Sequence, residues 1–194
     1  GEISSDLGWT YSYAWATFFY LGELNYAIEL TDKAYFVYDT IFKGHGAKLA
    51  WAAQNKGIAS LIKKEYAEAL KYFEFCIKEN DLLIPEQFRP HTYSITSYCN
   101  IANMLEVEEQ HERAIEIIQY TLNEAQKKHG KNHVYTANIL LSAGIIKHNI
   151  ENIKTAIEIY ENYEDVVPDI FYAEVCLSRI YYYTKHKEDA IETI

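Results

Sequence analysis

A six-residue phrase that recurs five times constrains this chain more than any other feature of its sequence. The phrase sets an alanine among apolar neighbours and reads NYAIEL, EALKYF, RAIEII, TAIEIY and DAIETI, around Ala27, Ala69, Ala114, Ala156 and Ala190. Successive alanines are 42, 45, 42 and 34 residues apart. Self-similarity at such periods is typical of stacked repeats rather than of a single globular core.

Each alanine has a partner position twelve residues earlier, and this constant offset predicts a pair of helices. The partners are Trp15, Gly57, Ala102, Gly144 and Ser178, four of which are small. A small residue lets two helices approach closely. A polar break falls between each partner and its alanine, and we expect the fourth break at residues 149–152. Each repeat is therefore predicted to be an αα-hairpin, that is, a helix, a tight turn and a second helix.

The unequal steps predict second helices of unequal length. From one alanine to the next small partner there are 30, 33, 30 and 22 residues, so the first three repeats exceed the fourth by 8, 11 and 8. Eight helical residues add about 12 Å to a helix. Gly44 and Gly130 are expected to end two of the long helices. Pro85 and Pro90 indicate that part of the 45-residue step is a loop.

This pattern resembles the tetratricopeptide repeat (TPR), which runs through a small residue, an aromatic, an alanine, a large apolar residue and a proline. The long steps, the phrase Asn100-Ile101-Ala102 and the run Lys131-Asn132-His133 are similar to the repeats of kinesin light chains and bacterial peptide-sensing regulators. The resemblance implies an all-α, right-handed superhelical solenoid of about five αα-hairpins, the last truncated. We expect one array over residues 1–194, with repeats at roughly 8–45, 46–90, 91–132, 133–168 and 169–194.

Charge and cysteine content exclude several classes of function. The chain has 28 acidic and 18 basic residues, and a net charge of −10 opposes binding to nucleic acid or to anionic membranes. Its longest apolar stretch is too short to span a bilayer.

Three widely separated cysteines indicate reduced thiols and hence a cytoplasmic location. The chain begins with Gly1 and stops within a helical pattern at Ile194, so we expect it to be a fragment of a larger protein.

The sequence predicts no enzyme activity, no catalytic residue, no metal site and no cofactor. His129 and His133 have the spacing of a metal-binding pair on a helix, but Gly130 interrupts that helix and favours a polar turn. A Cys-x-x-Cys motif, a nucleophile elbow and a phosphate-binding glycine-rich loop are all missing from the sequence.

In a solenoid of αα-hairpins the first helices line the concave face. Offsets from the small partner identify the residues expected to face inward. The position six residues before it holds Trp9, Trp51, Thr96, Asn138 and Tyr172, and the position two residues before it holds Tyr13, Asn55, Asn100, Ser142 and Cys176. The position one residue after it holds Ala16, Ile58, Asn103, Ile145 and Arg179, and the position four residues after it holds Phe19, Leu61, Glu106, His148 and Tyr182. These rows have amides at the centre and aromatic residues towards both ends.

From these rows we predict a peptide-binding site. Its residues are Trp51, Asn55, Asn100, Asn103, Asn138, Tyr172 and Arg179. An asparagine offers both a donor and an acceptor, so Asn55 and Asn100, at equivalent positions, are suited to clamp the backbone of an extended peptide. Trp51 and Tyr172 are the expected anchors. In the alternative interpretation each amide is solvated or bonds a neighbouring helix, and Arg179 is solvated rather than paired with an acidic group.

Two functions fit these features. The first is a scaffold or adaptor module that binds a protein or an extended peptide on the concave face. The alternative is a ligand- or peptide-sensing regulatory domain of a multidomain bacterial regulator. Because the last hairpin lacks a capping helix, homo-oligomerisation through that hairpin is a further expectation.

Overall fold

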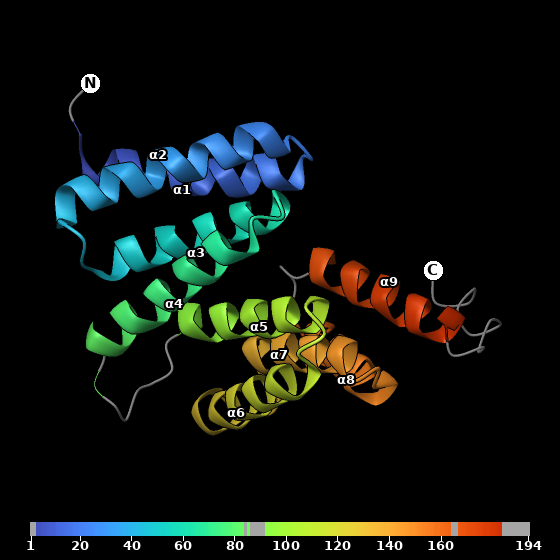
Figure 1. Ribbon diagram of the computed structural model, residues 1–194. Coiled ribbons are helices and arrows are strands. Elements are labelled where there is room, and N and C mark those ends of the chain that lie inside the picture. Colours follow the sequence, from blue (N-terminus) through green and yellow to red (C-terminus); the bar gives the residue numbers. More distant parts are fainter. Residues whose placement is uncertain (1–2, 84, 86–91, 164–166, 184–194) are drawn as a thin grey trace. The chain divides into compact units, whose positions relative to one another are not determined.

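The computed structural model describes residues 3–83, 85, 92–163 and 167–183, and every regular element in these ranges is an α-helix (Figure 1). The described helices are α1 (Ser5–Tyr20), α2 (Leu24–Phe42), α3 (Ala47–Ile62), α4 (Tyr66–Leu83), α5 (Thr92–Val107), α6 (His111–His129), α7 (Val134–Ile146), α8 (Ile150–Tyr160) and α9 (Val167–Tyr183). The predicted all-α repeat fold is confirmed. The chain forms two compact units, unit 1 (residues 1–100) and unit 2 (residues 101–194).

The helices pair as hairpins, and their lengths follow the repeat spacing. In unit 1, α1 packs along α2 and α3 along α4, while in unit 2 α7 packs along α8. The second helices α2, α4 and α6 have 19, 18 and 19 residues, whereas α8 has 11. The prediction of long second helices in the first three repeats is therefore confirmed. Helix α4 ends before Pro85, so the extra length of the 45-residue step is shared between helix and connection.

All four described hairpins turn in the same way. The backbone N–H groups of Glu23, Glu65, Gln110 and Asn149 donate to the carbonyl oxygens of Phe18, Ser60, Leu105 and Gly144 over 2.8–2.9 Å. This bond, from the third residue after the helix to the third-last residue of the helix, defines the Schellman motif. The residue before each of these donors has a left-handed conformation. These residues are Gly22 (φ 78°), Lys64 (φ 62°), Glu109 (φ 61°) and His148 (φ 49°).

The fourth hairpin turns three residues earlier than predicted. Helix α7 ends at Ile146 and α8 begins at Ile150, and the side chain of Asn149 accepts a bond from the N–H of Asn152. The positions equivalent to Gly57 and Ala69 are therefore Leu141 and Ile153, not Gly144 and Ala156. Asparagine is among the best N-cap residues, so Asn149 sets the start of α8. Ile153 and Ala156 are both fully buried, which is why apolar periodicity did not distinguish the two registers.

The small partner position works as expected in the second hairpin. A β-carbon on Gly57 would lie 2.6 Å from Cε1 of Phe73, whose side chain is fully buried against α3. Glycine is therefore the residue that allows α3 and α4 to pack at this distance. In the fourth hairpin, a β-carbon on Gly144 would meet the side chain of Ile153 and the carbonyl oxygen of Asn149.

A buried carboxylate fixes the start of α3 in unit 1. Glu79 of α4 is 3% exposed. Its side chain accepts from the backbone N–H of Gly46 at 3.1 Å and contacts Nδ1 of His45 at 3.1 Å. Gly46 precedes α3 and has no side chain to cap it. Glu79 therefore supplies the acceptor that the N-terminus of α3 lacks, from a helix 33 residues further along the chain.

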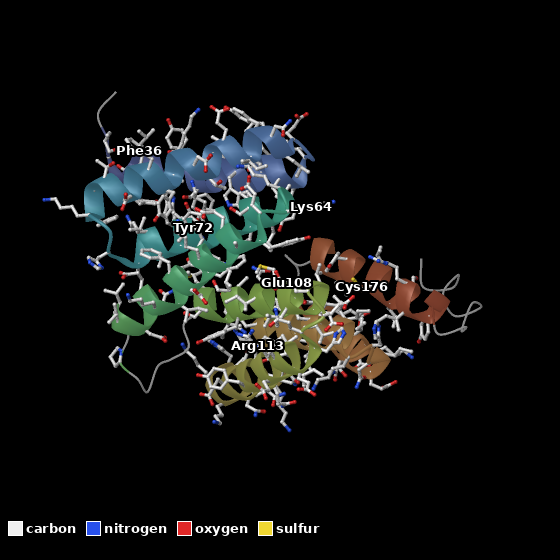
Figure 2. The ribbon with its side chains drawn as sticks, in the orientation of Figure 1. Phe36, Lys64, Tyr72, Glu108, Arg113 and Cys176 are labelled. Carbon is white, nitrogen blue, oxygen red and sulfur yellow. The ribbon has the colours of Figure 1, made fainter. Side chains whose placement is uncertain are left out.

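Lys56 joins three helices of unit 1. Its ammonium group donates to Asp32 of α2 at 2.9 Å. The same group lies 5.5 Å from the ring centre of Tyr35 on α2 and 5.3 Å from that of Tyr72 on α4, which is labelled in Figure 2. The two tyrosine rings meet edge to face. A half-buried cation between two aromatic rings thus holds α3 in register with α2 and α4.

Histidine and tyrosine rings cluster where α6 meets α7 in unit 2. Gly130 ends α6 as predicted, with φ 89° and its N–H donating to the carbonyl oxygen of Gln126. The rings of His129 and His133 stack at 4.8 Å, and Tyr135 lies 5.3 Å from His129. Nδ1 of His133 accepts from the N–H of Tyr135, so His133 caps α7. The two histidines therefore serve the connection between α6 and α7, in agreement with the polar-turn interpretation.

We expect stability to fall as the pH drops below about 6.5, in part through His129. Burial lowers the pKa of His129, and neighbouring His133 and Lys128 add to this shift. At position 129 the unfolded chain then binds a proton more readily than the folded chain. The contribution of neutral His129 to stability is therefore complete above the pKa of this residue in the unfolded chain, and it is lost as the pH falls through its pKa in the folded chain. Urea midpoints measured from about pH 7.5 to about pH 5.5 should decline less in His129→Gln than in the wild type.

The matched control for this experiment is His148→Gln, since His148 is exposed in a hairpin turn. Glu106 raises the pKa of His111, which acts in the opposite direction in every variant compared. An identical decline in the wild type and in His129→Gln would contradict the role given to His129.

Within the described residues, no helix is both long enough and apolar enough to cross a membrane. The fifth alanine, Ala190, and the second half of the last hairpin lie outside the described residues. The prediction of an exposed, uncapped C-terminal hairpin falls on that part of the chain.

Candidate functional site

Four aromatic side chains from three successive first helices of unit 1 gather on one face. We call this group the aromatic cluster: Trp9 and Tyr13 of α1, Trp51 of α3 and Tyr93 of α5. Ring centres are 4.7 Å apart for Trp9 and Tyr13, 5.3 Å for Trp9 and Trp51, and 5.9 Å for Tyr13 and Trp51. Tyr93 also stacks on Trp51, with ring centres 6.1 Å apart. The predicted rows six and two residues before the small partner therefore share a face in the first two repeats.

The aromatic cluster is only partly covered. Trp9 and Tyr13 are 46% and 54% exposed, while Trp51 and Tyr93 are half-buried. The ammonium group of Lys48 lies 6.0 Å from the Trp9 ring and donates to Ser5 at 2.7 Å. Tyr93 was not among the predicted site residues, because it lies nine residues before Ala102 and outside the four rows. The only sequence feature that could have identified Tyr93 is its position one helical turn before Thr96, the residue of α5 in the same row as Trp51.

Two of the predicted asparagines continue this face along α3 and α5. Asn55 lies four residues after Trp51, and Asn100 lies seven after Tyr93, so each shares a helix face with an aromatic residue. Asn55 is 6% exposed. The Nδ2 atoms of Asn55 and Asn100 are buried and donate no hydrogen bond within the described part of the chain. Leaving such a donor unpaired costs about 1–3 kcal/mol, which a bound acceptor would recover.

The predicted asparagines of unit 2 differ from those of unit 1. The Oδ1 atom of Asn138 accepts a 2.6 Å bond from the hydroxyl of Tyr160 on α8, so this side chain bonds the partner helix of its own hairpin. This orientation follows from the early turn, which moves Asn138 out of the row that contains Trp51. Asn103 on α5 is half-buried, and its Oδ1 atom has no hydrogen bond to the described residues.

Tyr172 and Arg179 lie on α9 beside a small groove of unit 2. The groove has a volume of about 170 Å³ and is lined by Ile145, His148, Cys176, Arg179 and Ile180. Tyr172 is 57% exposed, one helical turn from Cys176, which is labelled in Figure 2. Burial raises the pKa of the Cys176 thiol. Arg179 is exposed and forms no ion pair with a described residue.

The described side chains offer little for metal binding or for nucleophilic chemistry. No cluster of three or more histidine, cysteine, aspartate or glutamate residues suited to a metal ion occurs in the described ranges. Burial raises the pKa of Cys76 to about 11, so its thiol stays protonated at neutral pH. The arrangement is suited instead to stacking and to hydrogen bonding along the first helices.

Comparison with known proteins agrees with the helical-repeat fold. A family model described as tetratricopeptide repeat matches residues 93–167. A putative kinesin light chain of Podospora anserina with nearly identical TPR-like repeats superposes with a TM-score of 0.61 at 14% identity, covering 100% of this chain and 93% of that one. BtubC (BKLC) from P. vanneervenii gives 0.67 at 15% identity, covering 97% and 78%. Pseudomonas aeruginosa PilF gives 0.53 at 12% identity, covering 97% and 73%. No curated protein matches the sequence.

Proposed function

We propose that this chain is a tetratricopeptide-repeat scaffold that binds an extended segment of a partner protein on the faces of its first helices. The family model that matches residues 93–167 and the helical-repeat fold support this proposal. The observation that carries the proposal is the aromatic cluster of unit 1. Its rings are held together by packing, yet Trp9 and Tyr13 remain about half exposed. Contiguous exposed aromatic surface marks interaction sites, and tryptophan and tyrosine are enriched among the residues that dominate binding.

The two unpaired amide donors extend this surface from stacking to backbone recognition. Asn55 and Asn100 occupy equivalent positions in adjacent repeats, so they would meet successive stretches of one peptide running across α3 and α5. Their Nδ2 atoms have no hydrogen bond to the described residues. A peptide carbonyl that accepted from each, after a small rotation of the amide, would satisfy both donors without reading the peptide's side chains.

In unit 2 the proposed contacts are those of α9. Arg179 supplies an exposed guanidinium above an apolar groove, and Tyr172 supplies an exposed ring on the same helix. Such a groove accommodates one side chain of a partner, with an acidic group beside it. Asn103 is the further candidate of this unit. The cytoplasmic location, the single five-repeat array and the peptide-sensing alternative stay predictions.

Selection from a displayed library of random peptides tests this proposal. The wild-type chain is expected to enrich ligands, and enrichment should fall at least about tenfold in Trp51→Ala and in the double variant Asn55→Ala/Asn100→Ala. The matched control is Phe36→Ala, which removes a 62% exposed aromatic side chain from the second helix α2 of the same unit. Circular dichroism checks that each variant is folded. Ligands that depend on Phe36 but not on Trp51, or no enrichment at all, would overturn the proposal.

A further inference from the structure

We propose that the aromatic cluster of unit 1 and its two amides bind a proline-containing segment of a partner protein in the polyproline II conformation. This inference rests on the proposed function, and it goes further by naming the backbone conformation and the residue type that the face selects. Two observations support it: the polarity of the unpaired groups and the geometry of the rings.

Two of the buried polar atoms that lack a hydrogen bond on this face are donors. Asn55 and Asn100 each present an unpaired Nδ2. The indole N–H groups of Trp9 and Trp51 can only donate, and neither donates to a described residue, since the interactions of both side chains are ring contacts. A β-strand offers alternating N–H and C=O groups and needs acceptors as well. A proline-containing segment offers carbonyl oxygens with few N–H groups, which matches a face of donors.

The described residues also include unpaired acceptors, the Oε1 atom of Gln54 in unit 1 and the Oδ1 atom of Asn103 in unit 2. The Oε1 atom of Gln54 is buried without a hydrogen bond to the described residues. Gln54 stands three residues before Gly57, the position that Ser12 and Cys99 occupy in the neighbouring repeats, and all three are buried. The Gln54 row is therefore buried, whereas Trp9 and Tyr13 of the aromatic cluster are about half exposed.

The rings are arranged for flat, apolar partners. Trp9, Tyr13 and Trp51 pack at interplanar angles of 54–64°, so they fill the space between one another and turn their outer faces to solvent. A proline ring is rigid and apolar and stacks on such faces, and its chain loses little conformational entropy because φ is already fixed.

Titration with a matched pair of peptides tests the inference. The first probe is a blocked twelve-residue peptide that repeats Ala-Pro-Pro, and the second replaces every proline by threonine, which restores the N–H groups and favours an extended strand. Binding is followed by tryptophan fluorescence and calorimetry. We expect the proline peptide to bind at least about tenfold more tightly than the threonine peptide.

Variants separate the parts of the face. Trp51→Phe keeps a ring but removes the indole donor and should weaken binding of the proline peptide about threefold to tenfold. Trp51→Ala and Asn100→Asp should each weaken it at least about tenfold, while Phe36→Ala should leave it unchanged. Thermal melting of each variant identifies any loss that comes from unfolding. If Asn100→Asp is unfolded, Asn100→Ser replaces it.

The failure of this inference differs from the failure of the proposed function. If the threonine peptide binds as tightly as the proline peptide, and Trp51→Ala abolishes that binding, the preference for polyproline II is overturned while the peptide-binding face stands. If the proline peptide does not bind at millimolar concentration, although library selection yields ligands that depend on Trp51, the inference is likewise overturned. If neither the peptides nor the library give binding that depends on Trp51, both proposals fail.

Discussion

Gly57→Val is expected to lower the free energy of unfolding by about 2–3 kcal/mol. A β-carbon at this position would lie 2.6 Å from the ring of Phe73, far inside van der Waals contact. Phe73 is fully buried, and protein interiors are closely packed, so the valine is expected to push α3 and α4 apart. Urea denaturation followed by circular dichroism measures the loss. Stability within about 0.5 kcal/mol of the wild type would contradict the close approach of the two helices.

Two further variants show whether the loss comes from Phe73. Phe73→Ala alone should cost about 3–5 kcal/mol through the cavity that it leaves. In the double variant Gly57→Val/Phe73→Ala the valine occupies part of that cavity, so the combined cost should be at least about 1 kcal/mol less than the sum. Ala47→Val, at an exposed position of α3 away from Phe73, is the control and should cost well under 1 kcal/mol; valine is itself a better helix former than glycine, so helix propensity does not explain a loss at position 57. Additive losses would show that the two side chains do not meet.

Glu79→Ala is the second variant with a large expected effect, about 2–4 kcal/mol of destabilisation. The substitution removes the acceptor for the N–H of Gly46 and the partner of His45 Nδ1, and it leaves both at the unsupported start of α3. Hydrogen exchange should accelerate first at the N-terminal turn of α3, while equilibrium unfolding gives the total loss.

Two comparisons isolate the role of the Glu79 carboxylate. Glu74→Ala removes an exposed carboxylate from the same helix and should change stability by no more than about 0.5 kcal/mol. Glu79→Gln keeps one oxygen that can accept from Gly46 but loses the negative charge beside the helix N-terminus, so its stability should lie between those of Glu79→Ala and the wild type. Equal stability of Glu79→Ala and Glu74→Ala would contradict the capping role.

Much of the fold was predictable because backbone geometry repeats. The alanine phrase and its small partner predicted the hairpins, and the unequal steps predicted the long second helices. The register of the fourth hairpin was wrong by three residues. There Ile153 and Ala156 are both apolar and both fully buried, so periodicity fits either register. The choice depends on which asparagine caps α8, a local hydrogen bond that the repeat pattern does not contain.

The candidate site was predictable to a lesser degree. The rows of the first two repeats brought Trp9, Tyr13 and Trp51 together because equivalent positions on adjacent first helices lie side by side in unit 1. The stacking of Tyr93 depends on how far a side chain reaches along α5, which offsets between repeats do not show. Whether an asparagine is paired also depends on its surroundings. Asn138 is bonded by Tyr160, whereas Nδ2 of Asn55 has no such partner.

The shared hairpin turn also matters for engineering this protein. Lys64, Glu109 and His148 hold a left-handed backbone conformation that costs a residue with a β-carbon about 1 kcal/mol. The first hairpin avoids that cost with Gly22. The three side chains are exposed at the tips of their hairpins. At these three tips the chain therefore carries a polar side chain in a strained backbone conformation. Replacing each by glycine would relieve the strain and add stability without changing the faces of the first helices.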